Sequence, residues 1–293
     1  MTAITVRPIT DASGFHAVET LQRDVWGMPD LEVVPLHQLR AAVSAGGVLL
    51  GAFDEHATLV GFCYGFIGLR DGEFLFYSHM AGVRPGLQDR GIGFLLKRAQ
   101  RQEALERGLH RMVWTYDPLQ SLNASFNLRK LGVTASRYYV DYYGEMPDAI
   151  NRGLPSDRLE VDWWLRDPAV ETRLTGDAPL RSWPGAPAAL AGMMRAGTLA
   201  PQTALDHREA VVRVEVPATF GEMKSRVPDL ALAWRMASRG VFQHYFALGY
   251  QAVDFVTAPG EAAGSYILQR QTGPHPGPHS AGRSVAAGRK GHL

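Results

Sequence analysis

Hydrophobic and polar positions along the first fifty residues predict one strand followed by two helices. Residues 4–9 alternate between apolar and polar side chains, as a half-buried strand does. In residues 10–27 the apolar side chains recur every three or four positions, and Asp11 or Ser13 can cap that helix. Residues 33–47 predict a second helix that ends at a glycine.

The next patterns predict a hairpin, a strand, a loop and a long helix. Residues 47–55 and 57–72 are apolar runs joined by an acidic turn, which is typical of two antiparallel strands. Residues 72–85 mix aromatic and small side chains and predict the next strand, and a helix is expected over residues 91–107.

Extended and helical patterns then alternate up to a charged stretch that contains proline. They predict a strand, a short helix with a glycine stop and two more strands, over residues 108–118, 121–132, 135–146 and 159–168. We therefore expect a domain boundary near Asp167.

A second organised block follows this boundary. It is expected to contain a strand, a helix, a helix that runs into a strand, and a last strand, over residues 210–217, 220–240, 241–256 and 264–271. The end of the chain is rich in glycine and proline and has few large apolar residues, so it is expected to be disordered, and its histidines to be solvated rather than metal ligands. The expected division is a main domain, a smaller α/β extension and a tail, at residues 1–167, 168–271 and 272–293.

Composition limits the classes of function. With 46% hydrophobic and 20% charged residues, the chain has the make-up of a globular enzyme. Its 30 basic and 29 acidic residues leave a formal charge of +1, so no overall field attracts nucleic acid or a membrane surface. The single cysteine, Cys63, lies in an apolar run and is expected in the core. Without an apolar leader pattern or a run of ~20 apolar residues, a cytoplasmic protein is expected, and a homodimer stays open.

Gly91 and Gly93 stand at the start of the helix over residues 91–107. The start of a helix has unpaired N–H groups and the positive end of the helix dipole, and glycine lets a ligand approach the backbone, so the segment favours an anion such as phosphate. A tight turn without a ligand is the alternative. A dinucleotide fingerprint would need a third glycine and a Walker loop would need Gly-Lys-Ser/Thr, and neither is present.

The segment VRPGLQDRGIGFLL, residues 83–96, resembles the Q/R-x-x-G-x-G/A loop of the GNAT superfamily of acyl-CoA-dependent N-acyltransferases, through Gln88, Gly91 and Gly93. The order of elements around it is also similar, over roughly the first 165 residues. The resemblance implies an α/β GNAT fold, with a mixed, mostly antiparallel central sheet flanked by helices, and here with a smaller C-terminal extension.

Further segments are similar to a bacterial GNAT subfamily found beside N-acylamino-acid racemases. They are SHMAGVRP, WTYDPLQSLNASFNLRKLG and NRGLPSDRLEVDWWL, with a continuation through WRMASRGVF and GYQAVDF. Members of this subfamily are thought to acylate, including succinylate, amino acids. The resemblance implies transfer of an acetyl or succinyl group from acetyl-CoA or succinyl-CoA to a primary amine of a small molecule, an amino acid above all, without a metal. Acetylation of a protein N-terminus or lysine, and a coenzyme A sensor without turnover, are the alternatives.

The same resemblance implies the residues that bind the donor. Val83 would offer backbone groups to the pantetheine arm, and the backbone amides of the loop would cradle the phosphates, in Gln88, Asp89, Arg90, Gly91, Ile92, Gly93 and Phe94. Arg90, Lys97 and Arg98 either add positive charge beside the loop or lie on a solvated helix face. Asn123 and Asn127, one helical turn apart, could direct amides at the donor or the tetrahedral intermediate, with capping as the alternative for Asn123.

The attacking amine must lose a proton before it reacts, so a base is needed. Tyr77 and His79 share one face of their strand by the period-two rule, and the imidazole titrates in the right range. His79 is either this base or a hydrogen-bonded structural residue. Asp117, at a strand end, could hold the amine, relay its proton or simply cap the next helix. Glu73 is a further candidate by resemblance, although it is expected to be solvated.

In many GNAT enzymes a tyrosine protonates the leaving thiolate, and the resemblance places that position at Leu128. The sequence therefore leaves the general acid unassigned. Tyr142 or Tyr143 could supply it. A carboxylate on the acceptor or on a succinyl donor needs a fixed cation, for which the planar fork of arginine is suited. Arg129 and Arg158 are the candidates.

Overall fold

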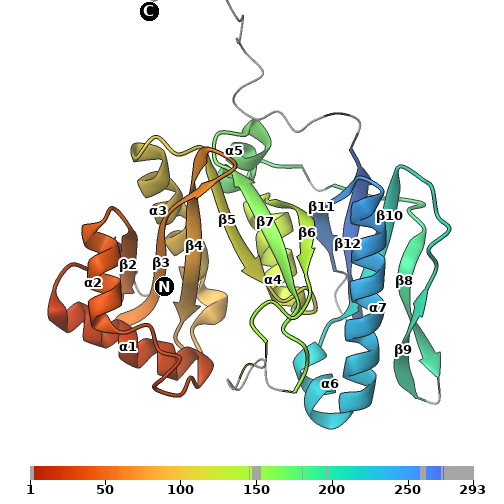
Figure 1. Cartoon of the computed structure of the whole chain (residues 1–293), viewed down its shortest axis with the longest axis horizontal. Coiled ribbons are helices and arrows are strands. Elements are labelled where there is room, and N and C mark those ends of the chain that lie inside the picture. Colours follow the sequence, from red (N-terminus) through yellow and green to blue (C-terminus); the bar gives the residue numbers. More distant parts are fainter. Residues whose placement is uncertain are drawn as a thin grey trace, which may run out of the picture.

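Twelve strands form one mixed sheet that runs through the whole protein (Figure 1). The computed structural model describes residues 3–144, 146, 153–179, 181–195, 197–257, 262–271 and 273. The order across the sheet is β1-β2-β3-β4-β5-β7-β6-β11-β12-β10-β8-β9, and most neighbours are antiparallel. The expected α/β class, with a mostly antiparallel sheet and flanking helices, is confirmed.

The strands of the first half are β1 (Thr5–Pro8), β2 (Val48–Phe53), β3 (Leu59–Arg70), β4 (Glu73–Val83), β5 (Arg111–Tyr116), β6 (Thr134–Tyr139) and β7 (Arg158–Trp164). Those of the second half are β8 (Ala188–Arg195), β9 (Thr198–Thr203), β10 (Val211–Pro217), β11 (Tyr250–Val256) and β12 (Ala263–Arg270). The helices are α1 (Ala12–Trp26), α2 (Leu36–Ser44), α3 (Ile92–Glu106), α4 (Ser121–Ala124), α5 (Pro168–Thr175), α6 (Phe220–Arg226) and α7 (Pro228–Ala247). The short segments η1 (Gln88–Arg90) and η2 (Ser125–Leu131) are a 3-10 turn and a π-helical end of α4.

Helices cover both faces of the first half, and neighbouring side chains of β3 show why. Phe62 packs in the core that β3 shares with α1 and α2, whereas Cys63 packs in the core that contains Leu96 of α3. Successive side chains of a strand point to opposite faces, so one strand supplies both cores. In Figure 1, α1 and α2 lie over β2 and β3. We call the α1 and α2 side the front face and the α3 side the back face.

Strands β4 and β5 are parallel neighbours that soon separate. They pair only at Phe76 with Met112 and at Tyr77 with Val113. On the other edge of β4 the register with β3 shifts, because Tyr64 pairs with Met80 and Gly65 pairs with Ser78, so that His79 is an extra residue. Such a bulge bends its strand and increases the local twist. Beyond Tyr77, β4 therefore leaves β5, and the two strands form a wedge.

The second half repeats the strand order of the first. In the first half, the third of three consecutive strands lies between the other two, in the order β5-β7-β6, and α4 connects β5 to β6. In the second half, the order is likewise β10-β12-β11, and α6 and α7 connect β10 to β11. Strand β8 runs parallel to β10 as β4 does to β5, while β9 follows β8 where the first half has α3. The halves meet where β6 pairs antiparallel with β11 through one residue pair, Ala135 with Ala252.

Side chains join the halves beside this narrow seam. Arg235 of α7 forms an ion pair with Asp117 after β5, with 2.6 Å between Nη2 and Oδ2. The Ser121 hydroxyl donates to the Pro217 carbonyl over 2.9 Å. Helix α7 lies over β12 in the view of Figure 1. An ion pair and a hydrogen bond between segments distant in the sequence therefore add to the single backbone pair that joins the two halves.

Several sequence expectations need correction in the second half. The single helix expected over residues 220–240 is two helices, because Pro228 lacks an N–H group and begins α7 instead of continuing α6. Helix α7 also extends to Ala247. Helix α5 and the β8–β9 hairpin were not expected at all, since they flank a Pro- and Gly-rich sequence over residues 176–187. The expected tail lies outside the described residues, except Gly273.

Gly65 should be essential to the bulged part of the sheet. A Cβ at Gly65 would lie 2.4 Å from Cε1 of Phe76 and 2.6 Å from the Tyr77 carbonyl oxygen. Because overpacking a tight core costs about 1–3 kcal/mol, Gly65→Ala is expected to lower the free energy of unfolding by that amount in a urea titration. Gly68→Ala, on the same strand, would bring its Cβ no nearer than 3.4 Å to Leu75 and is the control. Equal stability of the two variants would contradict the packing argument.

Candidate active site

The wedge between β4 and β5 opens onto a loop that leads into α3. Gly91 is the N-cap of α3 with a φ of 77°, and this residue makes no side-chain cap to the first N–H groups of the helix. The first turn contains no acidic residue. A Cβ at Gly91 would meet no atom within 4 Å, and one at Gly93 would meet only Phe126, at 3.9 Å. The start of α3 therefore offers N–H groups and open space to an anion.

The Gln88 side chain shapes this loop. Its Oε1 accepts a hydrogen bond from the Gly86 N–H over 2.8 Å, where Gly86 has a φ of 84°. This contact holds the turn that leads β4 from Val83 into η1. The side chain of Asp89 lies outside the described residues.

Positive charge gathers at the first turn of α3. The Arg98 guanidinium lies 5.8 Å from the centre of the Phe94 ring, and the Lys130 Nζ lies 4.8 Å from the same ring. Arg90 is exposed on the loop. Lys130 comes from the end of η2, and no sequence pattern links it to a loop some forty residues earlier.

Lys97 lies elsewhere, and both of its expected placements are wrong. Its side chain points inward and is buried, with Nζ donating to the Ser78 hydroxyl over 2.7 Å. Nζ also lies 3.7 Å from the centre of the Trp114 ring. Loss of water around the ammonium lowers the pKa of Lys97 to about 7. This charge belongs to the interior behind β4, neither at the loop nor on a solvated face.

His79 and Tyr77 lie together on the front face, as expected. Their ring centres are 6.5 Å apart, and the rings of Tyr64 and Phe66 on β3 pack around them, with Tyr64 5.9 Å from His79. His79 is exposed on this face, but the rings displace part of its water and lower the pKa of its imidazole. Burial, and then the nearby Tyr143, raise the pKa of Tyr77 far above its usual value. At neutral pH the imidazole can therefore accept a proton, and the Tyr77 phenol keeps its own.

A network of charged side chains continues the front face across β7. Glu160 is almost completely buried and pairs with Arg70 over 2.6 Å and with Arg137. Asp162 accepts a hydrogen bond from Nε of Arg111 over 2.7 Å. We did not expect these groups, although the alternation of polar residues at 158, 160 and 162 was a period-two signal for one polar face.

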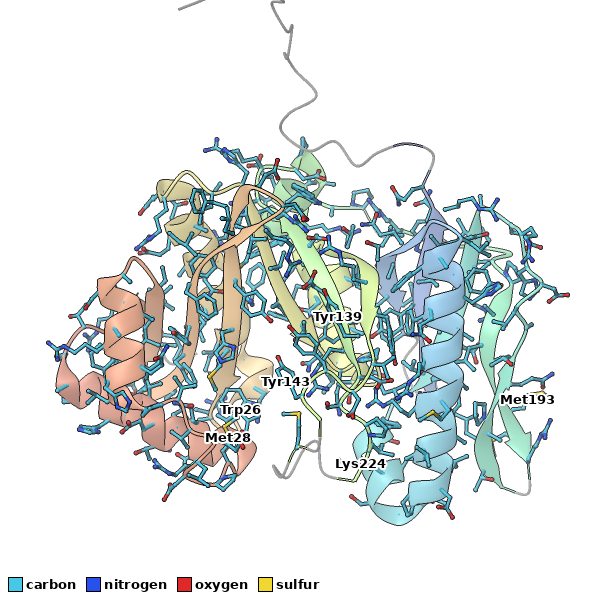
Figure 2. The ribbon with its side chains drawn as sticks, viewed as in Figure 1. Trp26, Met28, Tyr139, Tyr143, Met193 and Lys224 are labelled. Carbon is cyan, nitrogen blue, oxygen red and sulfur yellow. The ribbon has the colours of Figure 1, made fainter. Side chains whose placement is uncertain are left out.

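Tyr142, Tyr143 and Arg158 are brought to the same region. The Tyr143 hydroxyl lies 3.3 Å from the Thr115 hydroxyl of β5, and the Arg158 guanidinium lies 5.2 Å from the centre of the Tyr143 ring. Tyr142 packs 4.7 Å from Tyr143, centre to centre. In the view of Figure 2, Tyr143 lies between β4 and β7, with Tyr139 above it. The structure thus joins these side chains to the group that contains Tyr77.

Asp117 is engaged in structural contacts. Its Oδ1 accepts from the Leu119 N–H over 2.9 Å, and its Oδ2 pairs with Arg235. Capping of the following turn, one of the three expected roles, is thus observed. The ion pair occupies the oxygen that an amine would need.

The remaining candidates are not gathered at one point. Asn123 is exposed and Asn127 is buried, so the two amides face different surroundings. Arg129 lies 3.5 Å from Asp254 and lines a separate pocket of about 260 Å³ with Arg173 and Arg181. Leu128 is buried in the core. Glu73 is exposed, as expected.

The described part of the chain has no cluster of three or more His, Cys, Asp and Glu side chains suited to a metal ion. Among its helices, none has the length and apolar character to span a membrane.

Comparison with known proteins gives a likeness to solved structures alone. No protein-family model matches the sequence, and no curated protein is significantly similar to it. A GNAT family acetyltransferase from Elizabethkingia anophelis with acetyl-CoA bound is 16% identical, with a TM-score of 0.43 over 55% of this chain and 97% of that chain. The ribosomal-protein-S18-alanine N-acetyltransferase from Escherichia coli is 12% identical, with a TM-score of 0.44 over 55% and 92%. NAA60 from Arabidopsis thaliana, in complex with a bisubstrate analogue, is 18% identical, with a TM-score of 0.44 over 55% and 98%.

Proposed function

We propose that the chain is a GNAT-type N-acyltransferase that moves an acetyl or succinyl group from acyl-CoA to the primary amine of an amino acid. One observation carries the proposal, namely that β4 and β5 part directly beside the uncapped start of α3. Coenzyme A combines a diphosphate with a long extended arm. The helix start suits the diphosphate, and the free edge of β4 up to Val83 suits the amide groups of the arm. Because acyl-CoA is made and used inside cells, we place the enzyme in the cytoplasm.

The loop residues would hold the donor by contacts that the chain already presents. Backbone N–H groups of Gly91, Ile92 and Gly93 would donate to the phosphates, with Gln88 fixing the turn. The Phe94 N–H, also expected as a donor, already bonds to the Gly91 carbonyl over 3.0 Å. Arg90, Arg98 and Lys130 would supply the compensating charge. The charge is local, which agrees with the formal charge of +1 for the whole chain.

His79 is proposed as the base that takes the proton of the attacking amine. It is the titratable side chain at the bulge of β4, and its lowered pKa keeps the imidazole neutral at pH 7. The amine nitrogen would then attack the thioester carbon, and collapse of the tetrahedral intermediate would release the thiol. Tyr77 and the neighbouring rings would position the acceptor, since the Tyr77 phenol stays protonated.

Arg158 is proposed to bind the carboxylate of the amino acid or of a succinyl donor. It stands beside Tyr143, on the side of the sheet where His79 lies. The other candidate, Arg129, pairs with Asp254 in the separate pocket and is not proposed for this role.

Thiol release from acyl-CoA tests the proposal directly. Acetyl-CoA and succinyl-CoA are each mixed with a panel of L- and D-amino acids and with short peptides, and free thiol is followed. The only protein thiol, Cys63, is buried with its pKa raised to about 12 by desolvation. A thiol reagent therefore reports the free thiol of coenzyme A and not that of the protein. Turnover with an amino acid is expected. Turnover with peptides alone would show that the acceptor is a peptide or protein amine and not an amino acid. Binding of coenzyme A without thiol release would favour a coenzyme A sensor without turnover.

Gly93→Val is expected to weaken coenzyme A binding at least about tenfold, because a branched side chain would stand where the phosphates approach the helix start. Calorimetry with coenzyme A measures the dissociation constant. Gly221→Val is the matched control, since Gly221 is also the second residue of a helix with free space around it. Unchanged affinity in Gly93→Val, at an unchanged melting temperature, would remove the loop assignment.

His79→Ala should change both the rate and its pH dependence. In the wild type, kcat/KM falls as pH drops through the imidazole pKa, which burial lowers from its usual value. Loss of a positioned base costs about 100-fold or more, so the variant is expected to be slow at pH 7 and to lose the fall of kcat/KM toward acid pH. His56→Ala, in the exposed β2–β3 turn, is the control. If kcat/KM of His79→Ala falls toward acid pH as it does in the wild type (the acid limb of the pH profile), the imidazole is not the base.

A further inference from the structure

Lys97 stands at the apex of the wedge. Ser78 and Trp114 are the first residues of β4 and β5 beyond their last paired positions, Tyr77 and Val113. The Nζ of Lys97 contacts both of them, at 2.7 Å from the Ser78 hydroxyl and 3.7 Å from the centre of the Trp114 ring. The side chain therefore enters the sheet from α3 at the point where the two strands begin to part.

This buried ammonium has no carboxylate partner among the described residues. Its polar partners are the hydroxyl of Ser78 and Oε1 of Gln100, the latter at 3.4 Å. On β3 the nearby titratable group is the Cys63 thiol, which stays neutral. Glu103, on the same helix, is paired with Arg107. A buried charge with neutral partners is costly for stability, and such groups gather at functional sites.

Neighbouring residues of β4 place this lysine opposite the proposed base. Ser78 bonds to Lys97 and Gln100 of α3 on the back face, whereas His79 packs among Tyr64, Phe66 and Tyr77 on the front face. An acyl group held between β4 and β5 would thus have an imidazole in front and an ammonium behind. Leu128 of η2, the position at which the resemblance implies an acid, has a buried apolar side chain and no proton to donate.

We propose that Lys97 donates a proton to the sulfur of the departing coenzyme A, an inference that rests on the proposed acyltransferase function. The amine nitrogen forms a bond to the acyl carbon, the carbon–sulfur bond breaks, and its electron pair goes to sulfur. The sulfur takes a proton from Lys97, while the proton of the amine goes to His79. Release of that proton to solvent and uptake of one by Lys97 restore both groups, so one proton moves in net from amine to thiol.

The proposal fixes the sign of one limb of the pH profile. Ser78, Gln100, Trp114 and the neutral Cys63 thiol face the ammonium, and His79 lies across β4. The protonated form is the donor, so kcat/KM should fall as pH rises through about 7, the pKa to which burial lowers Lys97. Lys97→Met should remove this alkaline limb and keep the acid limb of His79.

A change of leaving group separates proton donation from a structural role. Acetyl-CoA and its selenoester analogue bind through the same groups, but a selenol is a far stronger acid than a thiol and leaves without a proton. Lys97→Met is expected to lower kcat with acetyl-CoA about 100-fold, within the usual range for a lost acid, and with the selenoester by less than about threefold. In Lys97→Met, KM and the affinity for coenzyme A should stay close to wild type. In the control Lys224→Met, kcat, KM and this affinity should all stay close to wild type with both donors.

The outcomes distinguish this inference from the function on which it rests. Equal losses of kcat with both donors, or an intact alkaline limb in Lys97→Met, would overturn the role of Lys97 while leaving the acyltransferase in place. A wild-type chain that turns over neither donor would overturn both. If Lys97→Met does not fold, Lys97→Gln keeps a polar group beside Ser78 and is judged by the same ratio of the two donors.

Discussion

The separation of β4 from β5 is the constraint on which the rest of the site depends. Parallel strands normally continue to pair along their length, but here pairing ends after Tyr77 and Val113. The extra residue at His79 bends β4 on one edge, and Lys97 and Trp114 fill the angle between the strands on the other. The backbone groups that this leaves unpaired need another partner, since buried polar groups without one are costly. The extended arm of the proposed donor, with its amide groups, would meet that need.

Small side chains let the surroundings close on this wedge. A Cβ at Gly82 would lie 2.9 Å from the Trp26 ring, so the end of α1 can approach β4 only because that position is glycine. Gly65 allows the same closeness to Phe76 beside the bulge. The front of the wedge is thus lined by aromatic rings and its back by α3.

Local signals in the sequence predicted those parts of the site that lie in one segment. Asp11 caps α1 through the Gly14 N–H, as expected from cap chemistry that acts over three or four residues. Gly91 stands at the start of α3, as expected from its place before the helical pattern. Tyr77 and His79 share a face because of the period of a strand. Lys97 and Arg98, in contrast, are adjacent and basic, and only the packing of α3 on β4 and β5 decides that one is buried and the other exposed. The pair of Asp117 with Arg235 joins residues 118 positions apart, for which the sequence has no local signal.

The repeated strand order has a consequence for stoichiometry. Strands β8 and β10 pair in parallel at two positions, as β4 and β5 do, yet β8 turns back into β9 and leads to no helix start. Among the described residues, the second half thus repeats a strand order without a helix start after β8 like that of α3. Under the proposed function, the described part of the chain would therefore bind one acyl donor, in its first half, although the order of four strands is repeated in the second.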